Sequence, residues 1–323
     1  MSPKPFVRHS GGPSVLRPDW RLPCLVLLCA LLWGSAFPGI KYVYAQWETN
    51  TLSLRLIFAG IRFTIAGCLI LPFCKQPMEE LREAPFPLLF GFALAQTYGQ
   101  YFFFYTGLAV SSGVLGALLV GTGSFWWMIL APRLLGSPSP TLKHWGVIAV
   151  SSLGIALAVY APGVGSGSPV IGAACFLAAT FVGALGAICV IPLAKTTNIA
   201  TATAFSLTAG GVLLTLSGIM ALDDLVQHLN IRLVMVTLYL AFVSAAAFSL
   251  WNWLVQIYSV NTLAGYRFLI PLCGVIESTI LIESEVPGPG IFAGGSLIVL
   301  SLLWLSRTEF QRERSSTEGT QES

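Results

Sequence analysis

Long apolar stretches follow one another along most of the chain, and each is long enough to cross a lipid bilayer. A membrane-spanning helix needs roughly 20 mainly apolar residues. Ten such stretches lie between loop signals, at residues 22–45, 51–73, 86–108, 111–135, 142–160, 169–191, 200–220, 232–257, 261–282 and 290–306. The runs are continuous, whereas barrel strands would show segments of about ten residues with alternating hydrophobicity. The sequence therefore predicts an all-α integral membrane protein with ten transmembrane helices.

The composition agrees with a surface that faces lipid. Hydrophobic residues make up 55% of the 323 residues, charged residues only 10%, and the mean hydropathy is +0.78. A typical soluble domain carries about 25% charged residues. We therefore expect the lipid bilayer to surround most of the chain. We expect no nucleic-acid partner, because the basic residues form no clustered basic domain.

The stretch "LLWGSAFPGIK", residues 31–41, fits two opposed interpretations. Its small residues Gly34, Ser35 and Ala36 look like the cleavage site of a secretory signal, and its apolar context looks like a retained span. The apolar core of a signal peptide should be shorter than the run found here, and nine further spans follow. We therefore expect residues 22–45 to be retained as the first transmembrane helix.

Basic residues are distributed unevenly between the two sets of loops. With ten spans, twelve of the seventeen fall on one side: Lys4, Arg8, Arg17, Arg21, Lys75, Arg82, Arg133, Lys143, Lys195, Arg307, Arg312 and Arg314. The opposite loops carry mainly Glu48, Asp223, Asp224, Glu283 and Glu285. By the positive-inside rule, both tails, residues 1–21 and 307–323, are expected in the cytoplasm.

Cysteine and histidine residues show no pattern of a disulfide framework or a metal site. The seven cysteines lie within or at the ends of apolar spans without a CxxC pair, and the three histidines are scattered. Zinc sites need clustered ligands at characteristic spacings. Phosphate-loop, HExxH and GxSxG patterns are absent as well. We expect no metal, no cofactor and no catalytic residue.

The chain contains an internal repeat. A shift of 148 to 150 residues brings Ala59-Gly60 onto Ala209-Gly210, and Gly146 onto Gly294. The repeats would be residues 22–160 and 169–306, joined by a Gly/Ser/Pro linker at 161–168. Because each repeat has five spans, the second is inverted relative to the first. Inverted repeats are a recurrent transporter architecture in which one repeat rocks against the other around a midplane site.

Several residues in this layout resemble the EamA family of the drug/metabolite transporter superfamily. They are Trp33-Gly34 with Lys41, Arg62 with Ala66, Pro271, and Glu285 nine residues before Gly294. The resemblance covers roughly residues 22–306. It implies a five-plus-five inverted-repeat carrier of small organic metabolites, most often an exporter in bacterial inner membranes, with Gly34, Lys41, Pro271, Glu285 and Gly294 as structural motif positions.

Two positions depart from the family pattern. Ser137 stands in the first repeat where Glu285 has its counterpart, and Gly123-Ser124 stands where the family usually has a proline in span four. A paired glutamate therefore cannot be assumed to be essential, and the resemblance does not carry over a substrate.

Four ionisable residues stand out at membrane depth in the predicted spans: Arg55, Arg62, Arg267 and Glu277. An intramembrane charge costs of order ~3 kcal/mol on insertion scales, so each suggests a function. Arg55 is near a span end and can extend to the interface. For Arg62, an anchor bonded to helix carbonyls is favoured over contact with substrate. Arg267 and Glu277 are separated by about 15 Å of helix rise and cannot pair within one span.

Glu277 is the acidic residue that lies well inside a predicted span. It could carry a proton in exchange for substrate, which would make protons the coupling ion. Alternatively, it locks helix packing, for example by pairing with Arg62. The sequence favours neither interpretation.

Polar and aromatic side chains at helical spacing predict a binding cavity. Tyr98, Tyr101 and Tyr105 recur at intervals of three and four, and Asn252 and Gln256 are four residues apart. Ligand cavities combine aromatic walls with a few placed polar groups. The candidate substrate-binding residues are Trp33, Tyr98, Tyr101, Trp126, Asn252, Gln256 and Arg267. Interfacial aromatic belts and helix packing are the alternatives.

These features favour a carrier over a membrane-embedded enzyme or sensor that acts on a lipid or small molecule. Arg62 and Arg267 outnumber Glu277, which favours a neutral, zwitterionic or carboxylate-bearing substrate over a cation. We predict a secondary transporter, working as a monomer or homodimer, that exports an amino-acid-like metabolite.

Overall fold

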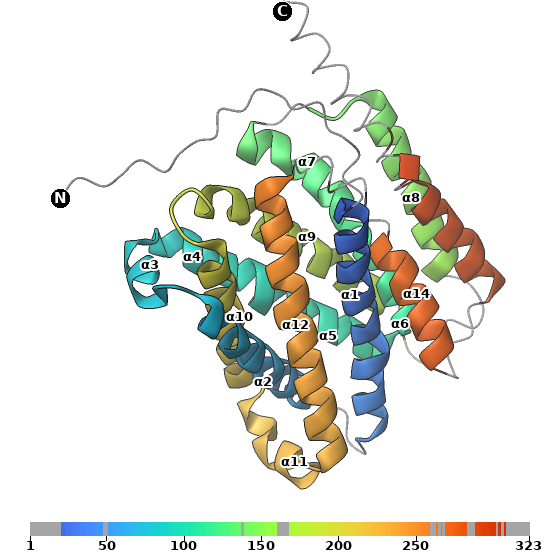
Figure 1. Cartoon of the computed structure of the whole chain (residues 1–323). Helices are drawn as coiled ribbons and strands as arrows, with labels where there is room; N and C mark the ends of the chain where they lie inside the picture. The colour runs from blue at the N-terminus through green and yellow to red at the C-terminus, as the bar shows by residue number, and fades with distance from the viewer. Residues whose placement is uncertain are drawn as a thin grey trace, which may run out of the picture.

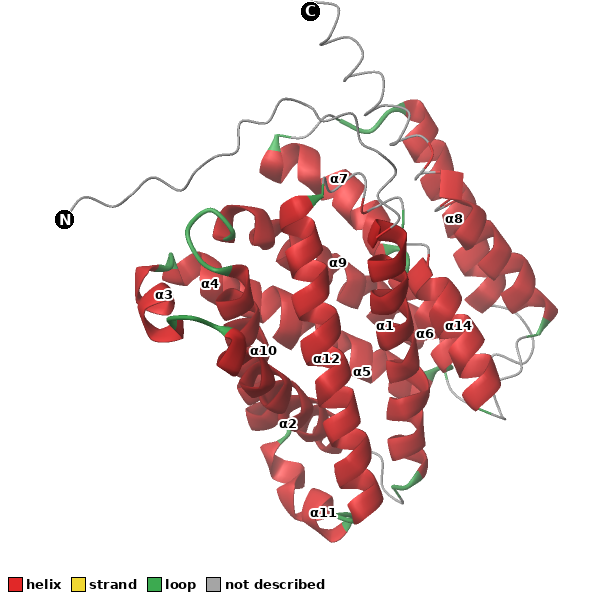
Figure 2. Cartoon of the chain, in the orientation of Figure 1, coloured by secondary structure: helices red, strands yellow, loops and turns green. Residues whose placement is uncertain are grey.

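The computed structural model describes residues 21–47, 51–136, 139–159, 168–258, 263, 266, 269–282, 288–301, 303–304 and 307. These residues form helices joined by loops and turns, with no strand among them (Figure 2). The all-α class is therefore confirmed. Arg267, Glu285, Ser137, most of the linker and nearly all of both tails lie outside the described residues.

The helices follow one another as a bundle (Figure 1). They are α1 (Arg21–Ala45), α2 (Leu52–Ile70), α3 (Pro77–Glu83), α4 (Phe86–Ala93), α5 (Gln100–Val110), α6 (Gly113–Val120), α7 (Gly123–Leu135), α8 (Leu142–Val159), α9 (Pro169–Leu193), α10 (Ile199–Ser217), α11 (Leu222–Gln227), α12 (Ile231–Ile257) and α14 (Leu269–Leu281). Shorter helical segments are η1 (Leu71–Phe73), η2 (Leu94–Gly99) and η3 (Ile219–Ala221).

Six helical segments are long and apolar enough to cross a membrane: Arg21–Ala45, Leu52–Phe73, Gly113–Leu135, Pro169–Leu193, Ile199–Ser217 and Ile231–Ile257. Shorter apolar helices cover Leu142–Ala158, Leu269–Leu281 and Pro289–Ser301. The chain is thus a multi-pass membrane protein, and the count of ten spans stays a prediction. The predicted first span is one continuous helix from Arg21 to Ala45.

Two predicted spans are interrupted within their length. In the third, η2 is a π-helical segment between α4 and α5. In the fourth, α6 ends at Val120 and α7 begins at Gly123. Thr122 lies in this break, where its hydroxyl donates to the Leu119 carbonyl at 2.6 Å. Broken helices are tolerated in membranes where protein or a cavity satisfies the freed backbone groups.

The crossing of α2 and α10 has local two-fold symmetry. A Cβ atom on Gly60 would overlap the backbone nitrogen of Thr215, and one on Gly211 would overlap that of Thr64. Thr64 donates to the Gly60 carbonyl at 2.8 Å, and Thr215 donates to the Gly211 carbonyl at 3.0 Å. The reciprocal pairing matches Gly60 to Gly211, one residue beyond the sequence alignment with Gly210.

Helix contacts repeat in the same symmetric way. α1 packs against α12 and α14, while α9 packs against α5 and against α6 and α7. If α9 corresponds to α1, the contact of α9 with α5 corresponds to that of α1 with α12. The contacts of α9 with α6 and α7 then correspond to that of α1 with α14. The pattern supports the proposed inverted repeat. Gly294 packs against Gly154 of α8, and a Cβ atom on Gly146 would meet no atom of the described residues within 4 Å.

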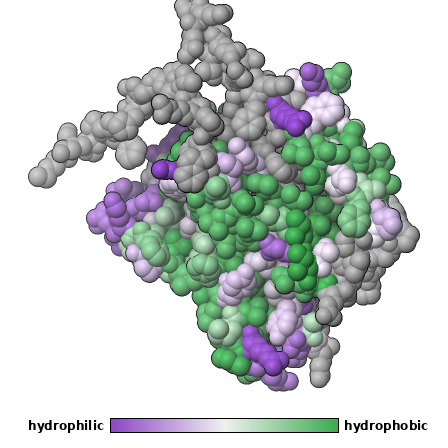
Figure 3. All heavy atoms as spheres, turned by 45° about the vertical axis from the view of Figure 1, so that its right-hand side comes forward, coloured by the Kyte–Doolittle hydropathy of each residue, from purple (hydrophilic) through white to green (hydrophobic). Residues whose placement is uncertain are grey.

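The surface in Figure 3 is mainly hydrophobic between more hydrophilic ends. Large side chains such as Met235, Leu238 and Phe242 on α12 are exposed. The short helices α3 and α11, which carry acidic residues, lie at the ends of the bundle (Figure 1). This distribution is the one expected for a protein embedded in lipid.

Candidate substrate cavity

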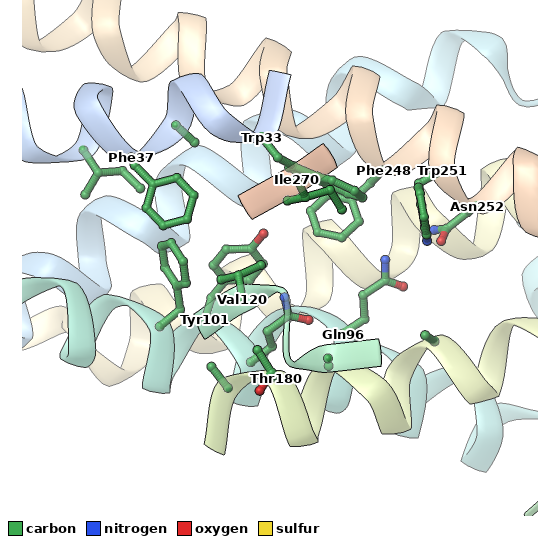
Figure 4. Close-up of a pocket in the computed structure, with 18 of the residues that line it drawn as sticks. Trp33, Phe37, Gln96, Tyr101, Val120, Thr180, Phe248, Trp251, Asn252 and Ile270 are labelled. Carbon is green, nitrogen blue, oxygen red and sulfur yellow. The ribbon is translucent and has the colours of Figure 1, made fainter. Parts of the chain in front are cut away.

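A cavity with about 970 Å³ of empty space, including the part continuous with the exterior, lies between helices of both halves (Figure 4). It is lined by Trp33, Ala36, Phe37, Ile40, Arg62, Gln96, Gln100, Tyr101, Phe104, Val120, Gly123, Ala179, Thr180, Gly183, Ala187, Phe248, Trp251, Asn252 and Ile270. Among the described residues of this lining, Arg62 is the charged one.

Aromatic rings form much of the cavity wall. The Trp33 ring lies 5.6 Å from Phe248 and 5.5 Å from Trp251, measured between centroids. The Tyr101 ring lies 5.5 Å from Phe104 and 6.2 Å from Phe248. These distances are typical of favourable aromatic pairs. The rings therefore fix one another and give the cavity a rigid apolar wall.

Two amide side chains, those of Gln96 and Asn252, lie toward one end of the cavity. Figure 4 shows Gln96 reaching toward the end where Trp251 and Asn252 lie, whereas Phe37 and Tyr101 lie at the other end. The Asn252 amide donates to the Thr203 hydroxyl at 2.9 Å, which fixes its orientation. The Gln96 side-chain oxygen is buried without a hydrogen-bond partner among the described residues.

Trp33, which also lines the cavity, has an indole N–H group without a hydrogen-bond partner among the described residues. The indole nitrogen of Trp33 is buried and has no hydrogen-bond partner among the described residues. Native proteins leave few buried polar groups unpaired, and an unpaired group costs about 1–3 kcal/mol. Two residues that line the cavity, Trp33 and Gln96, thus each have a buried polar atom without a partner among the described residues. Both are suited to a ligand that carries complementary polar groups.

Arg62 is held by protein groups of the second half and of α5. Its guanidinium donates to the Leu240 carbonyl at 3.2 Å, to the Ser244 hydroxyl at 3.1 and 2.9 Å, and to the Tyr105 hydroxyl at 2.7 Å. The side chain is 1% exposed. This arrangement favours the structural anchor among the predicted roles, while one edge of the residue still contributes positive charge to the cavity.

Glu277 lies against Gly34 at the contact of α14 with α1 and does not line the cavity. None of the hydrogen bonds of Arg62 in the described part of the chain goes to this carboxyl group. The structure therefore does not show the Arg62–Glu277 pair that the sequence allowed.

Trp126 lies behind the cavity wall. Its indole nitrogen donates to the Thr180 hydroxyl at 3.2 Å, and Thr180 lines the cavity. The Trp126 ring packs on Phe181 at 5.2 Å between centroids. Trp126 is therefore placed to orient a lining residue rather than to line the cavity itself.

Two other candidates lie away from the cavity. The Tyr98 hydroxyl pairs with Ser217 at 3.2 Å on an exposed part of the surface. The expected common face with Tyr101 and Tyr105 fails because η2 is a π-helix, whose wider turn changes the register. Gln256 shares a face with Asn252 but is exposed, one turn beyond it near the end of α12.

The family-motif residues have structural contacts. Lys41 donates to the Ser111 carbonyl at 2.6 Å, at the end of α5, where a cation also complements the helix dipole. Pro271 is buried in α14. Gly34 and Gly294 each lie at a close helix approach, to α14 and α8 respectively. Arg267 and Glu285 lie outside the described residues, so their proposed roles stay predictions.

Sequence reasoning gave no site role to several lining residues. Thr180 and Phe248 lie in apolar helices where neither composition nor spacing marks them. Gln96 has a usable signal, because it is an amide in the middle of an apolar span. Among the described residues, no group of three His, Cys, Asp or Glu side chains could hold a metal ion.

Comparisons with known proteins agree with this architecture. Residues 21–160 match the model of the EamA-like transporter family. The "Uncharacterized transporter YvbV" of Bacillus subtilis is 26% identical over 312 residues, which cover 94% of this chain and 97% of that protein. A "Probable amino-acid metabolite efflux pump" of Salmonella typhimurium is 22% identical, with 90% and 96% of the two chains covered.

A solved crystal structure has the same fold. It superposes with a TM-score of 0.60 at 15% sequence identity and covers 88% of this chain and 97% of that chain. At this identity the similarity bears on the fold alone. The family model matches the first predicted repeat, whereas the full-length relatives and the solved structure span both.

Proposed function

We propose that this membrane transporter is a member of the EamA-like transporter family, whose model matches residues 21–160, and that it exports a small amino-acid-like metabolite as a secondary transporter. Its substrate would be neutral, zwitterionic or carboxylate-bearing. The transporter would lie in a bacterial inner membrane with both termini in the cytoplasm, in keeping with the predicted loop charges.

The cavity is the observation that carries this proposal. It lies between helices of both halves, and among the described residues that line it Arg62 is the single cation and none is acidic. A cationic substrate would meet positive charge without a compensating carboxylate, which disfavours its binding. Aromatic walls together with the polar groups of Trp33, Gln96 and Asn252 suit a molecule with a compact polar end and an apolar side chain.

Alternating access supplies the mechanism. The reciprocal contacts of α1 and α9, together with the symmetric crossing of α2 and α10, give the two halves equivalent packing. Such halves can exchange conformations by rocking around a central site. The relative named as a probable amino-acid metabolite efflux pump supports the substrate class and the direction.

Counterflow in proteoliposomes tests the proposal. Vesicles loaded with unlabelled L-phenylalanine should take up labelled L-phenylalanine, while L-lysine should neither be taken up nor compete. Protein-free vesicles give the background. Uptake of L-lysine in preference would overturn the substrate class. Chemical conversion of the added compound by the purified protein, without movement, would instead indicate an embedded enzyme.

A further inference from the structure

The carboxyl group of Glu277 is packed directly on the backbone of α1 at Gly34. A Cβ atom placed on Gly34 would lie 3.0 Å from the Glu277 Oε1 atom and 3.1 Å from its carboxyl carbon. The carbonyl carbon of Cys273 would lie at 3.1 Å from the same position. The absence of a side chain at Gly34 is therefore what allows the carboxyl group to approach the helix backbone.

Pro38 makes this part of the α1 backbone unusual. It lies inside α1, four residues after Gly34. Proline has no backbone N–H, so the carbonyl of residue i−4 loses its helical donor. That carbonyl belongs to Gly34. The Gly34 carbonyl therefore lacks its normal helical donor, and the carboxyl group of Glu277 packs on the same residue.

One oxygen of this carboxyl group also lacks a partner among the described residues. The Oε2 atom of Glu277 is buried and has no hydrogen-bond partner among the described residues. Burial of a charge without donors is costly, whereas a protonated carboxyl group can donate one hydrogen bond. An acceptor on the facing backbone would meet that need.

Few titratable groups face this position. Among the described helices, α1 and α6 make the main contacts with α14, and α6 carries no titratable side chain. On α14 itself, Cys273 lies one turn away. On α1, Cys29 donates to the Ala247 carbonyl of α12, and Lys41 donates to Ser111. The other titratable residues of α1, Arg21, Cys24, Tyr42 and Tyr44, are separated from Gly34 by at least about 12 Å of helix rise.

We propose that Glu277 and the Gly34 carbonyl form the proton-binding site of this transporter. The protonated carboxyl group donates to the carbonyl that Pro38 deprives of its helical donor, and so joins α14 to α1. Release of the proton to water breaks this bond and lets the two helices separate. The inference rests on the proposed transport function and adds the coupling ion to it.

The position links the proton site to the cavity. Trp33 precedes Gly34 on α1 and Ile270 belongs to α14, and both line the cavity. A change in the contact of α1 with α14 therefore changes two of its walls. Protonation and substrate occupancy would each bias the same helix pair, which is the requirement for coupling.

Proteoliposomes with an imposed pH gradient provide the first test, with labelled L-phenylalanine as the probe. The wild-type protein should accumulate the probe with a gradient and exchange it without one. Glu277→Gln should lose the gradient-driven accumulation and keep counterflow. The glutamine amide can donate to the Gly34 carbonyl at any pH, because it has no proton to release. Pro38→Ala restores the helical donor to Gly34 and should lose the gradient dependence in the same way. Pro132→Ala, in α7, is the matched control and should behave as wild type.

Infrared spectroscopy of the purified protein provides a second test that needs no substrate. A carboxylic C=O stretching band that titrates with pH should be present in the wild type, absent in Glu277→Gln and shifted in Pro38→Ala. If the wild type exchanges no probe, the proposed substrate class fails, and the infrared result alone decides the proton site. Retained gradient-driven accumulation in Glu277→Gln, or an identical band in Pro38→Ala, would overturn the inference.

Discussion

Arg62 of α2 and Ser244 of α12 are joined by two hydrogen bonds, from Nε at 3.1 Å and from Nη2 at 2.9 Å. The bonds connect the two halves at a position where both side chains are buried. The planar guanidinium reaches Tyr105 with its remaining arm at 2.7 Å. This junction fixes three helices around one positive charge beside the cavity.

Removal of the Ser244 hydroxyl should destabilise the protein. Ser244→Ala leaves Arg62 with two fewer acceptor contacts, and hydrogen bonds to charged groups contribute about 1.5–3 kcal/mol. We expect a lower melting temperature in detergent and little change in which substrates are exchanged. Ser217→Ala, which removes an exposed hydroxyl paired with Tyr98, is the matched control. A selectivity change without loss of stability would argue against the anchor role.

Removal of the unpaired acceptor in the cavity should weaken binding without weakening the fold. Gln96→Leu loses the buried oxygen that has no protein partner. If the substrate supplies that partner, its apparent affinity should fall about tenfold, equivalent to about 1.4 kcal/mol. Concentration-dependent counterflow measures this. Gln256→Leu, on the exposed end of α12, should leave the affinity unchanged, and equal effects of both substitutions would refute the assignment.

The indole nitrogen of Trp33 can be removed while an aromatic ring is kept. Trp33→Phe should lower the affinity for a substrate with a hydrogen-bond acceptor, and the melting temperature should fall only slightly because no protein bond is lost. Trp253→Phe provides the comparison, since Trp253 is 46% exposed. An unchanged affinity would mean that Trp33 serves packing alone.

The glycines at the α2–α10 crossing should tolerate no side chain. Gly60→Ala and Gly211→Ala place a methyl group against the facing helix backbone. Overpacking of this kind costs about 1–3 kcal/mol. Lower yields of folded protein and earlier thermal aggregation in detergent are expected for both. Gly146→Ala has open space around it and should behave as wild type.

The helical class and some of the residues that line the cavity could be predicted from the sequence. Continuous apolar runs report membrane spans directly, and Trp33, Tyr101 and Asn252 stood out as large or polar groups within such runs. Tyr98 was misplaced because a π-helical turn cannot be read from apolar spacing. The sequence aligned Gly60 with Gly210, whereas the residue with equivalent packing at the helix crossing is Gly211. An alignment by residue type cannot show which backbone atoms come into contact. Thr180 gave no signal, since only a tertiary contact distinguishes it from other threonines.

The glycine faces of α2 and α10 have an evolutionary consequence. Thr215 of α10 packs on Gly60, and Thr64 of α2 packs on Gly211. Each glycine face is therefore buried by a threonine of the other helix. A larger residue at one of these glycines would need a smaller residue on the facing helix. Replacements at these positions would therefore have to occur in reciprocal pairs.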